Sequence, residues 1–508
     1  EEDDGWTDIT SGNTVSGLRL GQTIYARLFN GTEGSKTADI TITDLTKPSA
    51  QISLSGTSVE TTGSVTATVT FIDNESGLNI TGSKWVYNTN AGAIGEDAGS
   101  YANSFTNNNN PQTITLSTIT AGTYYLHVLT VDNAGNKIET ISDAITVKAG
   151  LVADGSYNES KGVNTPKLGS GMTAIKWNGS SWVETTGSDS DWYDYSAKKW
   201  ANAKTSDGSM WVWIPRFAYS ITSAGYHKST ATEISIEFMK GTRNETTSGR
   251  TSFNNASGQG NWNIHPAFNY GQPVSGLWVA KFEASNSNGK IKVQPGVQSW
   301  RSITVDSIYT NCINYNKTLN SHMMKNDEWG AVAYLSRSKY GKNDEVTINS
   351  NSSYYTGGGS GNTYVNNGAQ STTGNVWGVY DMSGGAWEYV AAYVNNGNTN
   401  LTKYGASLVN SSDARTKNVY TKASSDSYEN NYQQNKGVYG DAVYETSTSG
   451  NGTTSWYSDC SYFPYSSGPF FFRGGDYFYG SGAGVFCFNG SNGGGSSNDS
   501  FRPVLVAL

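Results

Sequence analysis

Residues 473–505 read RGGDYFYGSGAGVFCFNGSNGGGSSNDSFRPVL, and the rest of the chain is organised around this stretch. Between Arg473-Gly474-Gly475 and Ser500-Phe501-Arg502 it consists almost entirely of Gly, Ser, Asn, Asp, Tyr and Phe. Codons ending in a pyrimidine encode every interior residue, so randomising the first two bases of an Asn codon reaches all of them. Interchangeable residues on a fixed framework predict a recognition surface. The alternative is a Gly/Ser-rich surface loop without a role.

Residues 476–499, called the cassette below, contain two kinds of position. We expect Val485, Phe486 and Phe488 to be framework, because Phe486 and Phe488 alternate along a strand and point the same way. The predicted ligand-binding residues are Asp476, Tyr477, Phe478, Tyr479, Ser481, Cys487, Asn489, Ser491, Asn492, Ser496, Ser497, Asn498 and Asp499. We expect all of these except Asp476 at one exposed face. Tyr and Phe supply contact area with few rotamers to order, whereas Ser, Gly and Asn adapt their hydrogen bonds, as in antibody paratopes.

Composition limits the class of protein and its partners. A chain of 508 residues predicts about two to four domains. Only 15% of residues are charged, and 59 Gly with 32 Tyr favour β-structure and ordered loops. The net charge of −8 argues against a nucleic-acid partner. The sequence has no run of about 18 apolar residues, so we expect no membrane insertion.

The N-terminal third has the alternation of β-sandwich strands. Residues 1–46 look like part of one such module, and residues 47–149 like a second, with Val65, Val69 and Phe71 on one face and Leu126 and Val128 on another strand. We also expect Tyr124 inside. Short strands separated by turns resemble bacterial immunoglobulin-like modules. Such modules are spacers, and residues 150–207 are expected to connect them to the next domain.

Residues 208–508 are predicted to form one α+β domain. Apolar runs at 210–217 and 277–283 predict buried strands, and residues 344–375 have the composition of a loop. We expect two helices, near 326–337 and 383–393, the first capped by Asn326.

Three motifs of this domain resemble a known family. Gly378-Val379-Tyr380-Asp381-Met382-Ser383-Gly384-Gly385-Ala386-Trp387-Glu388 is similar to a motif of the formylglycine-generating-enzyme branch of C-type-lectin-like folds. The helix at 326–333 and the closing Arg-Gly-Gly and Phe-Arg elements also resemble that branch. Together with the cassette, the ending looks like a variable protein of a diversity-generating retroelement, in which a reverse transcriptase rewrites adenines at the 3′ end of the gene.

The enzymatic alternative requires reactive groups. Formylglycine-forming enzymes depend on a late cysteine pair, but Cys487 lies inside the cassette, and we interpret Cys460 and Cys487 as incidental thiols. The histidines have no metal-ligand spacing. Asp132-Asn133 is a possible calcium contact, although these residues also favour turns. Asp381 and Glu388 are interpreted as structural, with Glu388 pairing with Arg473 or Arg502. We therefore predict no catalytic residue, no metal and no cofactor.

The sequence thus predicts a binding protein rather than an enzyme. Its expected partner is a protein or glycan receptor on a target cell surface, and its expected location is a phage tail or a bacterial surface. Several copies in one homo-oligomer would raise avidity. A bacterial adhesin of the same fold, an enzyme of the formylglycine-generating type and a purely structural spacer with an inert tip remain the alternatives.

Overall fold

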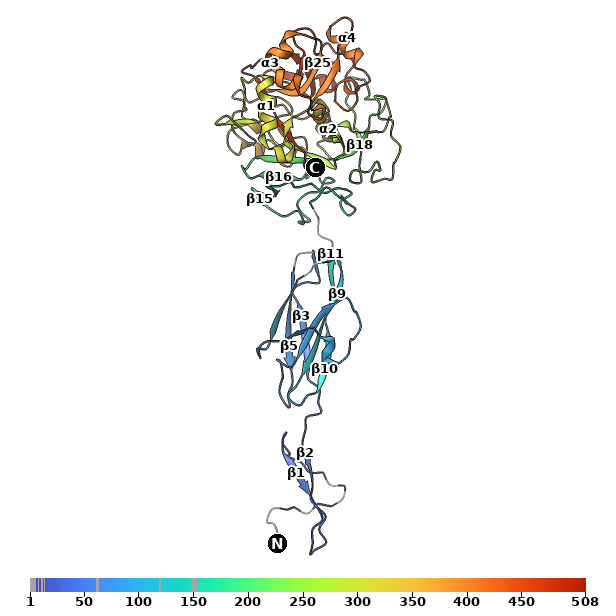
Figure 1. The fold of residues 1–508 in the computed structure, drawn as a ribbon, viewed down its shortest axis with the longest axis vertical. Helices are drawn as coiled ribbons and strands as arrows, with labels where there is room; N and C mark the ends of the chain where they lie inside the picture. Colours follow the sequence, from blue (N-terminus) through green and yellow to red (C-terminus); the bar gives the residue numbers. More distant parts are fainter. Residues whose placement is uncertain are drawn as a thin grey trace. The chain divides into compact units, whose positions relative to one another are not determined.

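The computed structural model describes residues 6–7, 9–10, 12, 14–60, 64–117, 120–148 and 153–508. The chain divides into two compact units, Glu1–Gly150 and Leu151–Leu508 (Figure 1). Both are built mainly from β-sheets, so the chain is a β-rich protein of more than one domain.

The N-terminal unit contains a hairpin and two larger sheets. The hairpin consists of β1 (Thr23–Ala26) and β2 (Ala38–Thr41). The three-stranded sheet, in the order β3-β5-β8, contains β3 (Ser49–Leu54), β5 (Ser64–Ile72) and β8 (Gln112–Ser117). The six-stranded sheet, in the order β4-β11-β9-β6-β7 with β10 on β9, contains β4 (Ser58–Glu60), β6 (Lys84–Asn88), β7 (Asn103–Ser104), β9 (Gly122–Val131), β10 (Lys137–Ile141) and β11 (Ile145–Lys148).

The two larger sheets bury one core between them. Val65, Val69 and Phe71 of β5 pack with Leu126 and Val128 of β9, as the alternation predicts. The sequence-based prediction for Tyr124 is wrong: this residue is only half-buried, and its ring stacks on Tyr87 at 5.0 Å. Tyr124 lies near the start of β9, where the strand is still partly exposed.

The C-terminal unit has a seven-stranded sheet at one end in Figure 1. Its order is β15-β14-β16-β17-β21-β30-β24, with β14 (Met172–Trp177), β15 (Trp182–Glu184), β16 (Asn202–Thr205), β17 (Met210–Pro215), β21 (Gly276–Ala280), β24 (His322–Met323) and β30 (Pro503–Leu505). Residues 150–207, expected to be a connecting segment, instead supply β14, β15 and β16 to this sheet. Trp192 and Trp200 of the same segment are completely buried, so the segment belongs to the core.

A five-stranded sheet lies toward the other end of this unit, near α3 (Figure 1). Its order is β26-β25-β27-β28 with β29 on β25, and it contains β25 (Trp387–Asn395), β26 (Asn418–Thr421), β27 (Phe470–Gly474), β28 (Gly484–Ser491) and β29 (Asp499–Phe501). Smaller sheets contain β12 (Tyr157–Asn158), β13 (Val163–Asn164), β18 (Phe217–Ser220), β19 (Ser235–Phe238), β20 (Asn263–Ile264), β22 (Ser285–Ser287) and β23 (Lys290–Lys292). The α-helices are α1 (Val305–Tyr315), α2 (Asn326–Ser336), α3 (Thr399–Asn410) and α4 (Tyr428–Gln434).

One of the two predicted helices is present and the other is not. Helix α2 confirms the first, but its N-cap is Lys325 rather than Asn326. The carboxylate of Glu328 accepts the Lys325 backbone N–H at 2.9 Å and takes over the capping role. The helix predicted at 383–393 is wrong, because β25 occupies that segment.

Two adjacent glycines explain why residues 383–393 do not form a helix. Gly384 and Gly385 have φ values of 73° and 75°, which end any right-handed helical path. The following residues, from Trp387 to Val394, are all buried, because β25 lies between β27 and β26 and is covered on both faces. A strand buried on both faces has a continuous apolar run, whose periodicity does not distinguish it from a buried helix.

Candidate ligand-binding site

The cassette is attached to the five-stranded sheet at three places. It leaves the sheet after β27, returns as β28, which pairs with β27, and ends at β29, which runs parallel to β25. The register places Arg473 opposite Phe488 and Asp499 opposite Trp387. The framework therefore holds both ends and the middle of a segment whose remaining residues form loops.

Framework side chains bind the cassette through its backbone. Arg473 donates from Nε to the Cys487 carbonyl at 2.9 Å, and Trp329 donates from Nε1 to the Val485 carbonyl at 2.8 Å. The Asp459 carboxylate accepts the Phe486 N–H at 2.9 Å. These contacts involve main-chain atoms: the two carbonyls are present in every residue type, and the N–H in every type except proline.

Arg473 is itself fixed by contacts outside the cassette. Its guanidinium is completely buried, and it donates to Asn326 Oδ1 at 2.6 Å and to the carbonyls of Asp441 and Ala442, both at 3.0 Å. Burial lowers the pKa of Arg473 to about 10. Glu388 was expected to pair with Arg473 or with Arg502. In the structure it forms a buried ion pair with Arg502.

A groove with a volume of about 720 Å³ lies beside the cassette. The predicted ligand-binding residues that line it are Tyr479, Asn489, Ser491, Asn492, Ser496, Asn498 and Asp499. Its other side is formed by Trp387, Tyr404, Ser467, Gly468 and Phe472, which lie outside the cassette. The structure thus combines seven of the thirteen predicted residues with a second group that the sequence did not indicate.

The remaining predicted residues lie away from the groove lining. Phe478 is 83% exposed, and Ser481 and Ser497 are also exposed. Tyr477 is half-buried, and its ring contacts Tyr354 edge-on at 5.0 Å. Phe478, Ser481 and Ser497 are therefore accessible, but they do not belong to the lining of the groove.

The prediction of one exposed face is wrong for Cys487 and Asp499, which are 0% and 5% exposed. Asp476, a predicted ligand-binding residue without an assigned exposure, is also buried. Asp499 is held in strand β29, and burial raises its pKa to about 6, with the charge of Asp476 acting in the same direction. Asp499 still contributes to the groove lining, whereas Cys487 does not.

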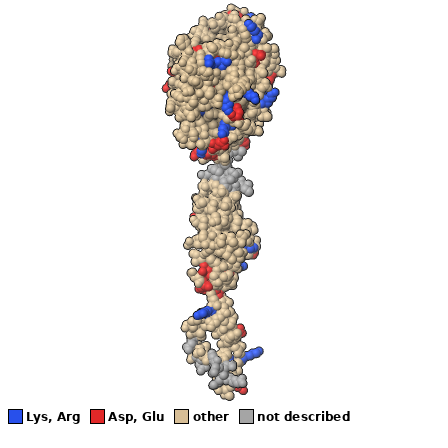
Figure 2. Space-filling view, turned by 90° about the vertical axis from the view of Figure 1, so that its left-hand side faces the viewer, with Lys and Arg blue, Asp and Glu red and all other residues tan. Residues whose placement is uncertain are grey.

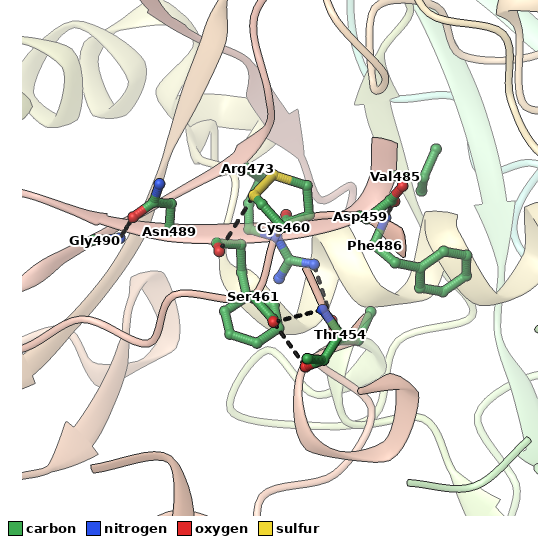
Figure 3. The surroundings of a disulfide bond; sticks show 12 residues. Thr454, Asp459, Cys460, Ser461, Arg473, Val485, Phe486, Asn489 and Gly490 are labelled. Atoms are coloured by element: carbon green, nitrogen blue, oxygen red, sulfur yellow. Dashed lines mark hydrogen bonds between the residues drawn. A yellow bond between two sulfur atoms is a disulfide. The ribbon is translucent and has the colours of Figure 1, made fainter. Parts of the chain in front are cut away.

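Cys487 is buried because it forms a disulfide with Cys460 (Figure 3). Trp387 packs against the two sulfur-bearing residues, with Tyr462 and Phe472 partly buried around them. The interpretation of these cysteines as incidental thiols is therefore wrong. Strand alternation does direct Cys487 away from Phe486 and Phe488, but the face it occupies is covered as well.

The residues that sequence reasoning missed come from three separate segments. Trp387 belongs to β25, Phe472 to β27 and Tyr404 to α3, and their rings reach the groove from outside the cassette. Trp387 and Phe472 have ring centroids 4.2 Å apart, and Trp387 and Tyr479 5.1 Å apart. No pattern in the sequence marks Tyr404, because only the fold brings α3 to the cassette.

Asp381 makes the hydrogen bond to a backbone N–H that its turn predicts. It accepts the Gly357 N–H at 2.8 Å and the Asn349 amide at 3.0 Å, and its φ of 63° is left-handed. Burial raises its pKa. These contacts fix the turn that leads into β25.

Asp132, the possible calcium contact, lies close to two other carboxylates in the N-terminal unit. Ligand oxygens of Asp44, Asp73 and Asp132 all lie within 4.8 Å of one another. Asp132 also accepts the Asn136 N–H at 2.7 Å, and Asp44 accepts the Thr46 N–H at 2.8 Å, so the turn residues already occupy oxygens of this cluster.

No family model matches the chain, and a search of curated proteins finds no significant relative. Among the residues that the structure describes, no helix has both the length and the apolar character needed to cross a bilayer.

Proposed function

We propose that the chain is a receptor-binding protein whose C-terminal cassette is diversified by a retroelement. In this proposal the C-terminal unit is a C-type-lectin-like domain, and the two-sheet module of the N-terminal unit is an immunoglobulin-like spacer. The observation that carries the proposal is the way the cassette is held. Buried framework side chains bind its main-chain atoms, while Phe478, Tyr479 and Asn492 project from the same segment with exposed side chains.

This arrangement separates folding from recognition. A substitution at an exposed cassette residue leaves the hydrogen bonds of Arg473, Trp329 and Asp459 in place, because those bonds end on backbone atoms. Exposed substitutions usually change stability by less than about 0.5 kcal/mol. Many cassette sequences are therefore compatible with one fold, as a diversified binding surface requires.

The proposed setting is a phage tail or a bacterial surface, with a protein or glycan receptor on a target cell. Modest affinity per copy is sufficient there, because several copies on one particle raise avidity through effective concentration. Figure 2 shows charged side chains of both signs scattered over a mostly uncharged face of the C-terminal unit.

Two observations test the proposal. The first is genomic: a near-copy of the codons for residues 470–505, differing only at adenines, should lie near a reverse transcriptase gene. The second is a library of the full chain randomised at Tyr477, Phe478, Tyr479, Asn489 and Asn492, displayed on a surface and sorted for folding. Most members should fold. A library that is mostly unfolded would contradict the proposed separation of framework and cassette.

The enzymatic alternative has less support. Both late cysteines are joined in one disulfide, and the free thiol of Cys312 is completely buried, which raises its pKa well above the usual value. A nucleophilic cysteine requires an accessible thiolate. Conversion of a peptide cysteine to formylglycine by the purified chain would favour the enzyme over the binding protein.

A further inference from the structure

We infer that the groove beside the cassette binds a neutral oligosaccharide without a metal ion. This inference rests on the proposed binding function and specifies the chemistry of the ligand. Its basis is the lining of the groove, which combines aromatic rings, small polar side chains and exposed glycine backbone.

The charge of the lining argues against an anionic ligand. None of the described residues that line the groove is Lys or Arg, and the only carboxylate is that of Asp499. Ligands with phosphate or carboxylate groups need cationic partners, especially Arg, which this surface does not supply. A single carboxylate is also too small a ligand set for Ca²⁺, which takes about six to eight oxygens.

The apolar part of the lining is aromatic throughout. Phe472, Tyr404 and Tyr479 are each partly accessible, and no described lining residue is aliphatic. A peptide ligand anchors through apolar side chains that enter desolvated pockets, which this open polar groove lacks. The face of a sugar ring instead presents C–H groups. These groups pack favourably against the face of an aromatic ring, which carries partial negative charge.

Two side-chain amides provide free hydrogen-bond donors. Asn489 and Asn492 each use the side-chain oxygen to accept a neighbouring N–H, from Gly490 at 2.7 Å and Gly494 at 2.8 Å. Their Nδ2 groups have no partner among the described residues. Because the amide oxygen is already hydrogen-bonded, the side chain is held in place and its N–H groups can donate to a ligand. A sugar hydroxyl can accept such a hydrogen bond, because it both donates and accepts. The glycines at 490, 494 and 495 leave neighbouring backbone accessible to the same ligand.

The groove has a volume of about 720 Å³. This volume lies within the range of about 300–1,000 Å³ that is typical of sites for small and medium-sized ligands. A protein surface would need a flatter and larger contact, about 800 Å² per partner. The groove therefore fits a short run of sugar units, and Phe478 beside it remains free to contact whatever carries the glycan.

The test uses the full chain and a set of neutral tetrasaccharides: cellotetraose, maltotetraose, mannotetraose and chitotetraose. Binding is measured by calorimetry and by saturation-transfer NMR, with 3′-sialyllactose as the anionic comparison. We expect at least one neutral saccharide to bind, equally well with EDTA present. Asn489→Ala and Tyr404→Ala should each weaken it about three- to tenfold, since each removes one contact. Asn430→Ala, which removes an exposed amide on α4, should leave it unchanged.

A second arm separates this inference from the proposed function. Fluorescent chain is applied to a panel of intact bacterial strains before and after periodate oxidation of surface sugars. Loss of binding on oxidation supports the inference. Binding that survives oxidation but is lost in Phe478→Ala overturns the inference and leaves receptor binding intact. The inference is also overturned if no neutral saccharide binds, if EDTA abolishes binding, if the sialylated sugar binds best, or if Asn489→Ala and Tyr404→Ala have no effect.

Discussion

Glu388 on β25 and Arg502 between β29 and β30 form a buried ion pair that joins the centre of the domain to its last strands. Nε of Arg502 donates to Glu388 Oε2 at 2.7 Å, and a second hydrogen bond joins Nη2 to Oε1. The two side chains are 1% and 0% exposed. Burial raises the pKa of Glu388 to about 7, although the charge of Arg502 opposes that shift. Two further N–H groups of Arg502 donate to the carbonyls of Ala280 and Tyr380.

Arg502→Leu should destabilise the protein by about 3–5 kcal/mol, because it leaves Glu388 buried without its counter-charge. Urea unfolding followed by tryptophan fluorescence measures the loss. Arg415→Leu is the control, since Arg415 and Asp413 form a pair that is 44% and 34% exposed. An exposed pair contributes about 0–1 kcal/mol. Similar losses for the two variants would contradict the importance of the buried pair.

Glu445 should make the stability of the C-terminal unit depend on pH. Its buried carboxylate accepts hydrogen bonds from the hydroxyls of Tyr219 at 2.8 Å and Tyr334 at 2.9 Å, and burial raises its pKa from 4.5 to about 7. Because the folded state holds the proton more tightly, this stabilisation is fully present below about pH 4.5 and is lost as the pH rises to about 7.

The comparison of wild type with Glu445→Gln isolates that contribution. The amide does not titrate, so we expect the variant to gain about 2–3 kcal/mol relative to wild type between about pH 5 and 8. Urea unfolding at several pH values gives the two profiles. Parallel profiles would show that Glu445 does not titrate in this range.

Cys487→Ser should lower the melting temperature by removing the disulfide to Cys460. Loss of a disulfide costs about 2–5 kcal/mol in small domains. The melting temperature of the wild type in reductant should be close to that of the variant in oxidant. Reductant should not change the melting temperature of the variant. If reductant leaves the wild-type melt unchanged, the disulfide either does not form or contributes no stability.

Phe486→Ala and Phe478→Ala should have opposite effects on folding and binding. Phe486 is 3% exposed and packs on Trp456, so its truncation should cost about 3–5 kcal/mol. Phe478 is 83% exposed, so its truncation should change stability by less than about 0.5 kcal/mol. Binding to intact target cells should fall in Phe478→Ala at unchanged melting temperature. A stability loss in Phe478→Ala would place this residue in the framework.

Val69→Asp should unfold the two-sheet module of the N-terminal unit, because Val69 is 0% exposed and an unpaired charge there is strongly unfavourable. Thr68→Asp on the same strand is the matched control, since Thr68 is only half-buried. Circular dichroism melting of the full chain distinguishes them. Equal effects would contradict the assigned buried face.

Strand alternation was readable from the sequence over much of the N-terminal unit, whereas the cap of α2 was not, because the N-cap is Lys325 and not the predicted Asn326. The buried face of β5, with Val65, Val69 and Phe71, follows from a two-residue period that needs no partner to be recognised. Helix α2 follows from its apolar spacing. The prediction of a helix at 383–393 is wrong because residues buried on both faces lose the period that separates strand from helix.

The sequence by itself determined which segment is held by a framework and which residue types are available for recognition. Arg473, Phe486 and Phe488 were identified because anchors and alternation are local properties of the chain. Only the tertiary structure decided which cassette residues reach solvent. It paired Cys487 with Cys460, buried Asp499 in β29, and brought Tyr404 of α3 to the groove. The physical reason is that exposure depends on what covers a side chain, and here the covering residues come from distant segments.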